Sequence, residues 1–577
     1  MIADYVRTTY ESPPRFRAMY FRKKTSGGRA YLQIVESRRE GAAVRQQVIA
    51  TLGRVEDLRE SGQLERLLRS GARFAAKAIV VDAAAAGEVT ASAARRVGPA
   101  LVFERLWEET GCRKVVEDLA GARKHDFALE RAVFLTVLHR LFAGGSDRAA
   151  DRWREDYRID GVEGLDLHHL YRAMAWLGEE LAEDQQDGAT PFAPRCLKDV
   201  VEETLFARRR DLFSTLDLVF MDTTSLYFEG AGGQTLGRRG FSKDHRPDLN
   251  QMILAVLLDG DGRPVCTEMW PGNTADTGSL IPVVDRLRKR FSVRRVCVVA
   301  DRGMISAETI AELEARGLLY ILGVRERTDK LVRDLVLDDP APFVPFVLTK
   351  RKKDIEYEAK AVALAGRRYI VCRNREEMKK DAAARAAILA ALERQLKKGD
   401  KTLVGNKGYR RFLATPGDDH FAIDRAKAEE DAKFDGVFVL RTNADLSPLE
   451  TMLCYKQLWR VERAFRTSKS LFATRPIFHK LDETIRGHVS CSFLALVLKK
   501  ELEDRIANVG KAAADGDAAE GGSWPDILAD LDSLTETEVE QDGKRFLLRS
   551  APRPAASLAL RAAGVALPPT VRQLAQD

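Results

Sequence analysis

The N-terminal part of the chain alternates apolar and polar residues at the period of a β-strand. Residues 17–24, 29–37 and 43–52 follow this period, and the first two segments are separated by Gly27 and Gly28, which are typical of a turn. We therefore predict a small sheet of three strands. The sheet is basic, which suits contact with a polyanion, although a docking module would show the same pattern.

Apolar residues then recur at helical spacing. In residues 129–142 a stripe of alanine, valine and leucine runs along one face of the predicted helix. Similar periods predict helices at residues 58–68, 99–107, 149–155, 167–181 and 197–213. This part of the chain is expected to form a helical domain.

Beyond the last of these helices, short apolar strands alternate with helices. Strands are predicted at residues 216–221, 250–258, 264–270, 295–300 and 319–324. One helix at residues 277–290 precedes the fourth strand, and another, capped by Ser306, precedes the fifth. Three strands, helix, strand, helix, strand is the order of a ribonuclease H-like α/β fold, in which the first three strands are antiparallel and the later ones parallel.

The α/β pattern is interrupted after residue 326. A mainly β insertion precedes a strand at residues 436–441, which leads back to the α/β domain. The predicted domains are a β-rich module at residues 1–80, a helical domain at 81–212, the first part of the ribonuclease H-like domain at 213–326, the insertion at 327–433, the second part of the ribonuclease H-like domain at 434–508, and a linker with a small C-terminal module at 509–577.

Residues 447–469 are predicted to form one helix that begins at Ser447. Tyr455, Glu462 and Lys469 are seven residues apart, and at ~100° per residue such a step returns almost to the same azimuth. The three side chains are therefore expected on one face. Taken alone, this spacing is typical of a solvated face of charged residues.

Composition is that of a soluble globular protein. The chain has 577 residues, of which 45% are hydrophobic and 31% charged, so it can form several domains. Its N-terminus lacks the pattern of a signal peptide, and no apolar run approaches the ~18 residues of a membrane span, so we expect a cytoplasmic protein. The seven cysteines are scattered and form no CxxC pair, which favours reduced thiols over disulfides or a zinc finger.

Positive charge is concentrated in one part of the chain. Residues 350–411 contain 19 Lys and Arg against 8 Asp and Glu, whereas the whole chain has a net charge of only +7. The rest of the chain is therefore slightly acidic. A localised basic surface suits a polyanion such as DNA, although solvated basic faces are common.

Two aspartates follow predicted apolar strands. Asp222 comes directly after residues 216–221, and Asp301 directly after residues 295–300. A single aspartate in this position is usually a turn or cap residue, but the predicted strand order brings these two together, at the strand ends where α/β sheets place their sites. Neighbouring carboxylates repel unless a cation neutralises them, so Asp222, Asp301 and Glu462 predict a divalent-metal site. The rival acids are Glu268, Asp276 and Glu308, the last of which is explained by its place at a helix N-terminus.

Several segments resemble those of bacterial insertion-sequence transposases of the DDE class, in the insertion-sequence-four group and its relatives. The segments are MDTTSLYFEG, GFSKDHRPDLNQ, PGNTADTGSL, VVADRGMIS and YKQLWRVERAFRTSK. The resemblance implies that Asp222, Asp301 and Glu462 are the catalytic, metal-binding triad. It also implies a Tyr-Arg-Glu-Lys signature, which Tyr455, Glu462 and Lys469 match, whereas Leu458 stands at the arginine position.

The resemblance further implies an activity and its partners. We expect a transposase that binds the inverted repeats of its element, cuts the ends and joins the 3′-hydroxyls to target DNA, acting as a homodimer on DNA without a membrane or small-molecule substrate. The expected cofactor is Mg²⁺, as two ions, with Mn²⁺ able to substitute. The expected DNA contacts are Tyr455, Lys469, Arg466 (with Arg460 as another substitute for the missing arginine), Lys243, His245 and Arg246.

Two alternatives remain at this stage. A nuclease of the same fold would cut DNA without joining it, and a catalytically silent descendant of a transposase would only bind it. The intact triad argues against the silent protein. The helical domain at residues 81–212 is the expected DNA-binding domain. The expected location is the bacterial cytoplasm, where the protein is associated with the nucleoid when it is bound to DNA.

Overall fold

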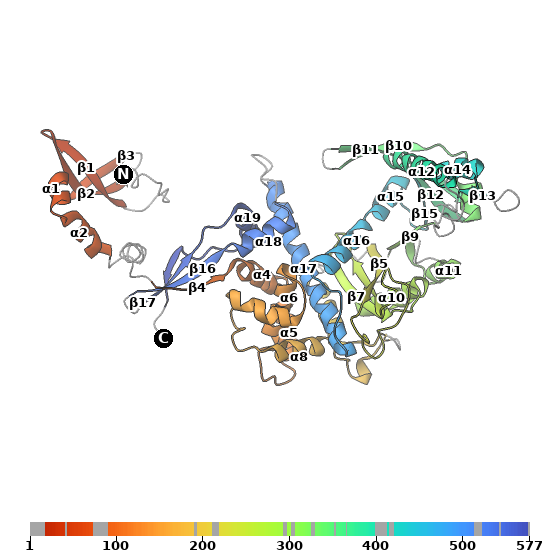
Figure 1. Cartoon of the computed structure of the whole chain (residues 1–577), viewed down its shortest axis with the longest axis horizontal. Helices are drawn as coiled ribbons and strands as arrows, with labels where there is room; N and C mark the ends of the chain where they lie inside the picture. The colour runs from red at the N-terminus through yellow and green to blue at the C-terminus, as the bar shows by residue number, and fades with distance from the viewer. Residues whose placement is uncertain are drawn as a thin grey trace. The chain divides into compact units, whose positions relative to one another are not determined.

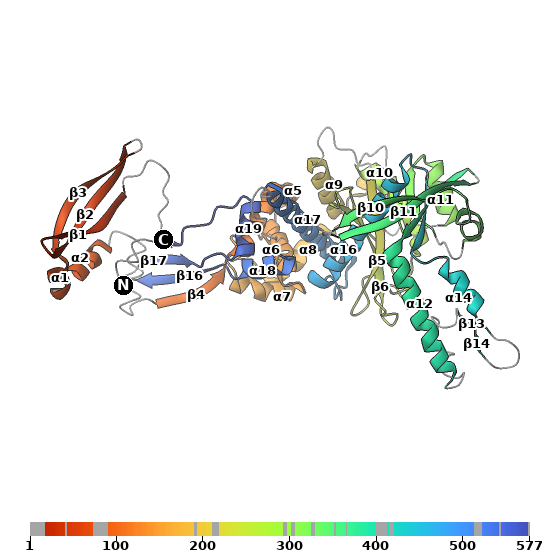
Figure 2. The ribbon, with the colours of Figure 1, turned by 90° about the horizontal axis from the view of Figure 1, so that it is seen from above.

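The computed structural model describes residues 18–40, 43–72, 90–187, 189, 193–209, 218–291, 297–301, 306–324, 329–350, 353–364, 366–397, 412–414, 421–512, 522–541 and 544–574. They belong to two compact units (Figures 1 and 2). The first consists of Met1–Arg95, Thr535–Ala551 and Pro568–Asp577, and the second of Arg96–Leu534 and Pro552–Leu567. No helix in the described part of the chain has the length and apolar character needed to cross a membrane.

The first unit contains the predicted N-terminal sheet. Strands β1 (Ala18–Ser26), β2 (Arg29–Glu40) and β3 (Ala43–Arg54) are antiparallel in the order β1-β2-β3, which confirms the prediction. The single helix predicted at residues 58–68 is wrong. Two short helices, α1 (Val55–Glu60) and α2 (Gln63–Ala72), replace it, because Gly62 has a left-handed φ of 64° that interrupts the helix.

A second sheet of this unit joins segments from the two ends of the chain. Strands β4 (Thr90–Arg96), β16 (Thr535–Gln541), β17 (Lys544–Arg549) and β18 (Val571–Gln573) pair in the order β18-β17-β16-β4. Strand β17 belongs to the C-terminal module predicted from the sequence at residues 509–577. The C-terminal segment is therefore tied to a strand that precedes the helical part of the chain.

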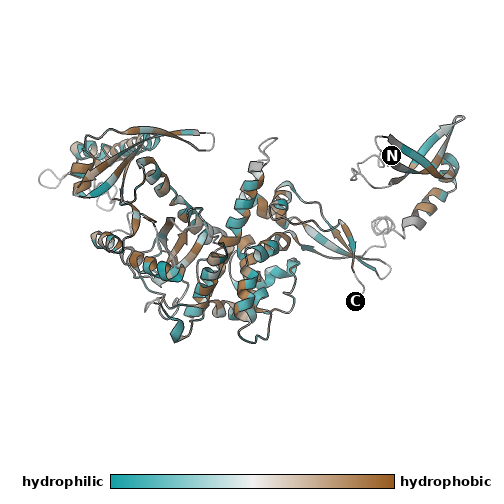
Figure 3. Ribbon diagram, turned by 180° about the vertical axis from the view of Figure 1, so that it is seen from behind, coloured by the Kyte–Doolittle hydropathy of each residue, from teal (hydrophilic) through white to brown (hydrophobic). Residues whose placement is uncertain are grey.

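The second unit begins with the predicted helices. They are α4 (Gly98–Glu109), α6 (Leu129–Phe142), α7 (Asp147–Trp153), α8 (Leu167–Leu177) and α9 (Leu197–Arg209), and one further helix that was not predicted, α5 (Cys112–Ala120), lies between α4 and α6 in the chain. Apolar and polar residues alternate along them, as the brown and teal bands of the helices in Figure 3 show. The long helix α17 (Asp482–Ala512) packs against α4, α6, α8 and α9 and against strand β7, so it connects the helical layer to the sheet. Helices α18 (Trp524–Asp532) and α19 (Pro554–Ala562) complete this layer.

The sheet of the second unit has nine strands in the order β10-β11-β12-β15-β9-β8-β5-β6-β7. Strands β5 (Leu218–Tyr227), β6 (Gln251–Leu258) and β7 (Pro264–Pro271) are antiparallel, whereas β8 (Cys297–Ala300) and β9 (Leu319–Gly323) run parallel to β5. This arrangement confirms the ribonuclease H-like fold. Helices α10 (Asp276–Phe291) and α11 (Ala307–Ala315) connect these strands, and Ser306 caps α11 as predicted.

Helices cover both faces of this sheet. Alternate residues of β6 belong to two different cores: Leu254 and Val256 pack in the core that includes α17, and Ile253 and Ala255 in the core that includes α10 and α11. A strand covered on both faces is apolar along its whole length, which explains why β6 lacks the alternation of a half-exposed strand.

The insertion continues the same sheet. Strands β10 (Val344–Lys350), β11 (Lys353–Leu364) and β12 (Arg367–Asn374) join it through β15 (Val437–Thr442), which pairs with β9. The insertion also contains α12 (Arg375–Leu396), β13 (Leu413–Ala414), β14 (Ala422–Ile423) and α14 (Arg425–Ala432). Residues of the insertion can therefore reach the region around β8 and β9 through a continuous strand ladder.

Candidate active site

Asp222 and Asp301 lie on neighbouring parallel strands. The last pair in the register of β5 and β8 is Phe220 with Val299, so two residues further along each chain Asp222 and Asp301 are at the same level of the sheet. Asp301 directly follows β8, as predicted, and is exposed. The half-buried Asp222 accepts a hydrogen bond from the backbone N–H of Thr223 at 2.7 Å.

The prediction that a strand ends at Asp222 is wrong. Strand β5 continues to Tyr227, and residues 223–227 pair with β6. Thr223, Thr224 and Ser225 are buried although they are polar, because threonine favours the extended backbone and the strand ladder satisfies their main-chain groups. Asp222 is therefore fixed within a strand on both sides, rather than at the start of a loop.

Glu462 lies on a helix whose predicted length is wrong. Residues 447–469 form α15 (Pro448–Lys456), α16 (Trp459–Arg466) and a π-helical turn at Thr467–Leu471. The capping box of Ser447 and Glu450 confirms the predicted start. Between α15 and α16 the N–H groups of Gln457 and Leu458 bond three residues back instead of four, which tightens the turn and separates the helices.

The three acids line one pocket of about 300 Å³, which we call the acidic pocket. Its described lining consists of Asp222, Asp301, Phe438, Tyr455, Lys456, Leu458, Trp459 and Glu462. The Tyr455 hydroxyl donates to Asp301 Oδ1 at 2.9 Å, and the Tyr455 ring stacks on Phe438 with centroids 6.3 Å apart. Residues of β5, α15 and α16 and the residue directly after β8 thus meet at one site, even though the predicted single helix does not exist.

The donor set of the acidic pocket fits a divalent cation. Its charged acids offer carboxylate oxygens from three different elements, and its described lining contains neither cysteine nor histidine, so it suits a hard ion such as Mg²⁺ or Mn²⁺. The three acids of the acidic pocket do not bring their ligand atoms within 4.8 Å of one another; in the described part of the chain only Asp166, His168 and His169 do so. That group is explained by helix capping, because Asp166 and His169 form the capping box of α8.

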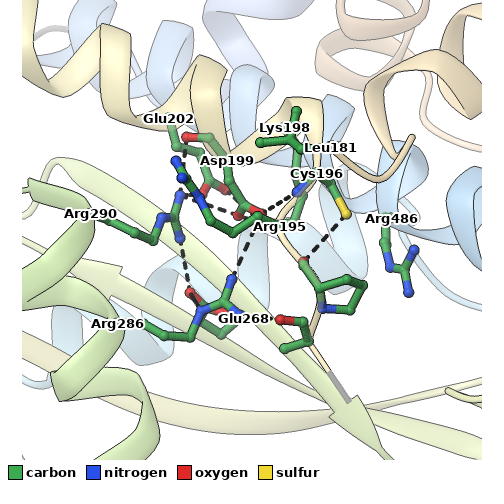
Figure 4. Close-up of polar contacts among 12 residues, drawn as sticks. Leu181, Arg195, Cys196, Lys198, Asp199, Glu202, Glu268, Arg286, Arg290 and Arg486 are labelled. Carbon is green, nitrogen blue, oxygen red and sulfur yellow. Dashed lines mark hydrogen bonds and ion pairs between the residues drawn. The ribbon is translucent and has the colours of Figure 1, made fainter. Parts of the chain in front are cut away.

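Glu268, one of the rival acids, belongs to a buried ion-pair network. The network consists of Lys198, Asp199 and Glu202 on α9, Glu268 on β7, and Arg286 and Arg290 on α10 (Figure 4). Glu268 Oε1 accepts from Arg290 Nη1 at 2.9 Å and from Arg286 Nε at 3.2 Å. Its charge is therefore already compensated by the protein.

The network also explains the state of Asp199. Burial alone would raise the pKa of this carboxyl group. The positive charges around it, first Lys198 and then the two arginines of α10, outweigh burial and hold that pKa below its ordinary value. The other two rivals lie at helix starts: Glu308 is exposed in the first turn of α11, and Asp276 is the first residue of α10, with a side chain outside the described part.

Among the predicted DNA contacts, Lys469 and Lys243 are engaged within the protein. Lys469 Nζ donates to Asp244 at 2.7 Å, and Arg475 contacts the same carboxylate at 2.7 Å. Burial lowers the pKa of Lys469, and the Asp244 carboxylate opposes that effect. Lys243 Nζ donates to the Thr223 carbonyl at 2.7 Å, so its loop is fastened next to Asp222.

The remaining predicted contacts lie outside the described lining of the acidic pocket. Arg246 pairs with Asp248 at 2.9 Å, and His245 has a positive φ of 58°. Arg466 is exposed at the end of α16, and Arg460 donates to the Gly260 carbonyl beside a different pocket. Neither of these arginines lines the acidic pocket, whereas the buried side chain of Leu458 forms part of its wall.

Three lining residues were not expected from the sequence: Phe438, Lys456 and Trp459. Phe438 comes from the strand that follows the insertion, so no local pattern connects it with the acids. Lys456 and Trp459 neighbour Tyr455 and Leu458, and they lie on either side of the break between α15 and α16.

Comparisons with known proteins give two family matches. The family described as the transposase DDE domain matches residues 214–498, and the N-terminal domain of the IS1634 family of transposases matches residues 20–85. A solved structure described as the Mos1 mariner paired end complex with Mn is 14% identical, with a TM-score of 0.13. The match covers 37% of this chain and 65% of that chain, less than two thirds of its length. No curated protein matches the chain.

Proposed function

Since the chain belongs to the DDE transposases of insertion sequences, we propose that it binds the terminal inverted repeats of its element, cleaves the ends and joins the freed 3′-hydroxyls to target DNA. The observation that carries this proposal is the acidic pocket. Its three carboxylates come from strands and a helix far apart in the sequence, and a metal-dependent phosphoryl transfer needs such a set at one place.

Asp222, Asp301 and Glu462 are the proposed metal ligands and the catalytic triad. Two Mg²⁺ ions, which Mn²⁺ can replace, would supply activation of the attacking oxygen and stabilisation of the leaving oxygen. The Tyr455 hydroxyl orients Asp301 through its hydrogen bond, and β5 holds Asp222 at a fixed level beside it. The attacking oxygen is that of water during cleavage and that of the 3′-hydroxyl during joining.

DNA is the proposed partner. Tyr455, Lys469 and Arg466 would contact phosphates near the cleaved end, with Lys243, His245 and Arg246 beside them. The basic residues between 350 and 411 would add affinity that does not depend on sequence and that falls with salt. Because two ends must be joined to one target, a homodimer on DNA in the bacterial cytoplasm is proposed.

The test is an end-joining assay with duplexes that carry the inverted repeats bordering the gene. Purified protein with Mg²⁺ is expected to nick these duplexes and to yield joined target product, and EDTA is expected to stop both reactions. Asp222→Ala should abolish both, whereas Asp187→Ala, which removes a surface acid that is 83% exposed, should leave them unchanged.

Each failure of this assay has a separate meaning. Nicking without joined product would make the protein a nuclease of the same fold. End binding without nicking would make it a catalytically silent descendant, and nicking that persists in Asp222→Ala would remove the proposed triad.

A further inference from the structure

Lys456 is a cation placed among the acids of the acidic pocket. It is the last residue of α15, and among the described residues that line this pocket it alone has a basic side chain. The other ionisable lining residues are Asp222, Asp301, Glu462 and the Tyr455 phenol. A cation within an acidic cavity calls for a reason, because the metal ions that the acids would hold repel it.

The contacts of Lys456 are aromatic. Its Nζ lies 4.1 Å from the centroid of the Tyr357 ring and 5.3 Å from that of Phe438, and it donates a hydrogen bond to the Tyr357 hydroxyl at 2.8 Å. Cation–π contacts and a neutral acceptor hold an ammonium in place without cancelling its charge. The side chain of Lys456 is therefore oriented while its positive charge stays available to a ligand.

The residue that fixes Lys456 belongs to the insertion. Tyr357 lies on β11, is only 6% exposed, and stacks on Phe346 of β10 with ring centroids 5.8 Å apart. Its backbone pairs with Phe346 on one side and Asn374 of β12 on the other. A tyrosine held by two neighbouring strands is a rigid support, whereas a lysine stem alone has four rotatable bonds.

We propose that Lys456 contacts the DNA directly, donating from Nζ to a non-bridging oxygen of a phosphate beside the cleaved bond, and that Tyr357 positions it. This inference rests on the proposed function, because it assigns the DNA phosphate that the acidic pocket receives. An ammonium has three donors, of which Tyr357 takes one, so two are available for phosphate oxygens. The insertion thereby contributes to the active site through β11.

The variant that tests this contact is Lys456→Gln, which keeps a polar side chain that can reach Tyr357 but removes the charge. Single-turnover cleavage of an inverted-repeat duplex is expected to slow roughly 10- to 100-fold, the loss typical of one charge-assisted hydrogen bond. Lys456→Arg should retain most of the rate. Lys289→Gln is the matched control, because Lys289 is a surface lysine of α10 that is 57% exposed.

Neutral phosphates distinguish a DNA contact from a structural role. Duplexes with a single methylphosphonate at each position around the cut should reveal one phosphate whose neutralisation slows the wild type but no longer slows Lys456→Gln. Equal sensitivity of both proteins at every position would overturn the proposal. Should Lys456→Gln fail to fold, the same scan on Lys456→Arg decides. Each methylphosphonate should then slow Lys456→Arg as much as it slows the wild type, except at the contacted phosphate, where the size of the effect should differ.

The role of Tyr357 is tested by Tyr357→Phe, which removes the hydroxyl and keeps the ring. We expect a smaller loss of rate than in Lys456→Gln, and no additional loss when the two changes are combined, because both act on one contact. Additive losses would show that Tyr357 acts independently of Lys456. Absence of cleavage by the wild-type protein would remove the proposed function itself. Equal cleavage rates of the wild type and Lys456→Gln would remove only this inference.

Discussion

The second unit contains two groups of acids that the protein treats in opposite ways. In the buried ion-pair network, Asp199, Glu202 and Glu268 are at most 2% exposed and each contacts a lysine or arginine between 2.7 and 3.7 Å away. In the acidic pocket, Asp301 and Glu462 are exposed, and Asp301 accepts a hydrogen bond from the uncharged side chain of Tyr455. The first group is neutralised by the protein, and the second is the one we propose as the site of a cation.

This difference separates stability from function. Buried charges persist only when partners compensate their desolvation, so loss of one partner destabilises the fold. Exposed carboxylates contribute little to stability, and their repulsion is relieved when a metal ion binds. Changes in the two groups should therefore affect different measurements, and four experiments examine this, from the largest expected effect to the smallest.

The largest effect is expected for Glu462→Gln. Cleavage of end DNA should fall about 1,000-fold or more, because a metal-assisted transfer loses several kcal/mol of transition-state stabilisation without its ligand. The urea midpoint of unfolding should stay that of the wild type, since Glu462 is exposed. A large fall in the unfolding midpoint would place Glu462 among the structural acids, and the two groups of acids would then no longer differ in their effect on stability.

The opposite result is expected for Asp199→Ala. This change leaves Lys198 and the arginines of α10 with uncompensated buried charge, so the free energy of unfolding should fall by about 3–5 kcal/mol. Cleavage per folded molecule should remain at the wild-type rate. Urea unfolding measures the free energy of unfolding, and cleavage assays with active-site titration measure the rate per folded molecule. A lower cleavage rate in fully folded Asp199→Ala would contradict the assignment of Asp199 to the structural group.

The pH dependence of that stability difference is the third test. The folded-state pKa of Asp199 lies below its ordinary value of 3.8, so its contribution to stability is complete above that value and is lost as the pH falls through the folded-state pKa. The gap between wild type and Asp199→Ala should therefore be constant from pH 7 to pH 5 and shrink toward pH 3. A gap that widens on acidification would mean that Asp199 is protonated in the native state.

The smallest effects are expected for Lys469→Met, because Lys469 shares features of both groups. Its side chain is 12% exposed and pairs with Asp244, which keeps Arg475 as a second partner, so the expected loss of stability is about 1–2 kcal/mol. If Lys469 also binds a phosphate, the slope of log affinity for end DNA against log salt should fall by about 0.9. An unchanged slope would assign Lys469 to the structural group alone.

The sequence predicted the order of strands and helices in the sheet and the position of Asp301. Both depend on local signals: apolar strands bounded by turns, and the Ser306 cap that starts α11. The position of Asp222 within β5 was not predicted, because Thr223 and Ser225 are polar and resemble a loop until their pairing with β6 is known. Pairing between segments far apart in sequence is not visible in a local pattern.

The broken helix had a different cause. The seven-residue spacing of Tyr455, Glu462 and Lys469 assumed one straight helix, but the helix is interrupted between α15 and α16 and continues into a π-turn after α16. Tyr455 and Glu462 still meet at the acidic pocket, while Lys469 lies next to Asp244. The contribution of β11 through Tyr357 could not be predicted, because it requires the insertion to join the sheet.

The place of β15 in the sheet has a consequence for the order of folding. Strand β9 pairs with β8 on one side and with β15 on the other, yet β15 is synthesised only after the whole insertion. During translation β9 therefore remains an open edge, and its pairing depends on contacts of high sequence separation, which form slowly. The side of the acidic pocket that contains Phe438 can form only after the insertion has been synthesised. A nascent chain therefore contains Asp222 and Asp301 well before the acidic pocket is complete.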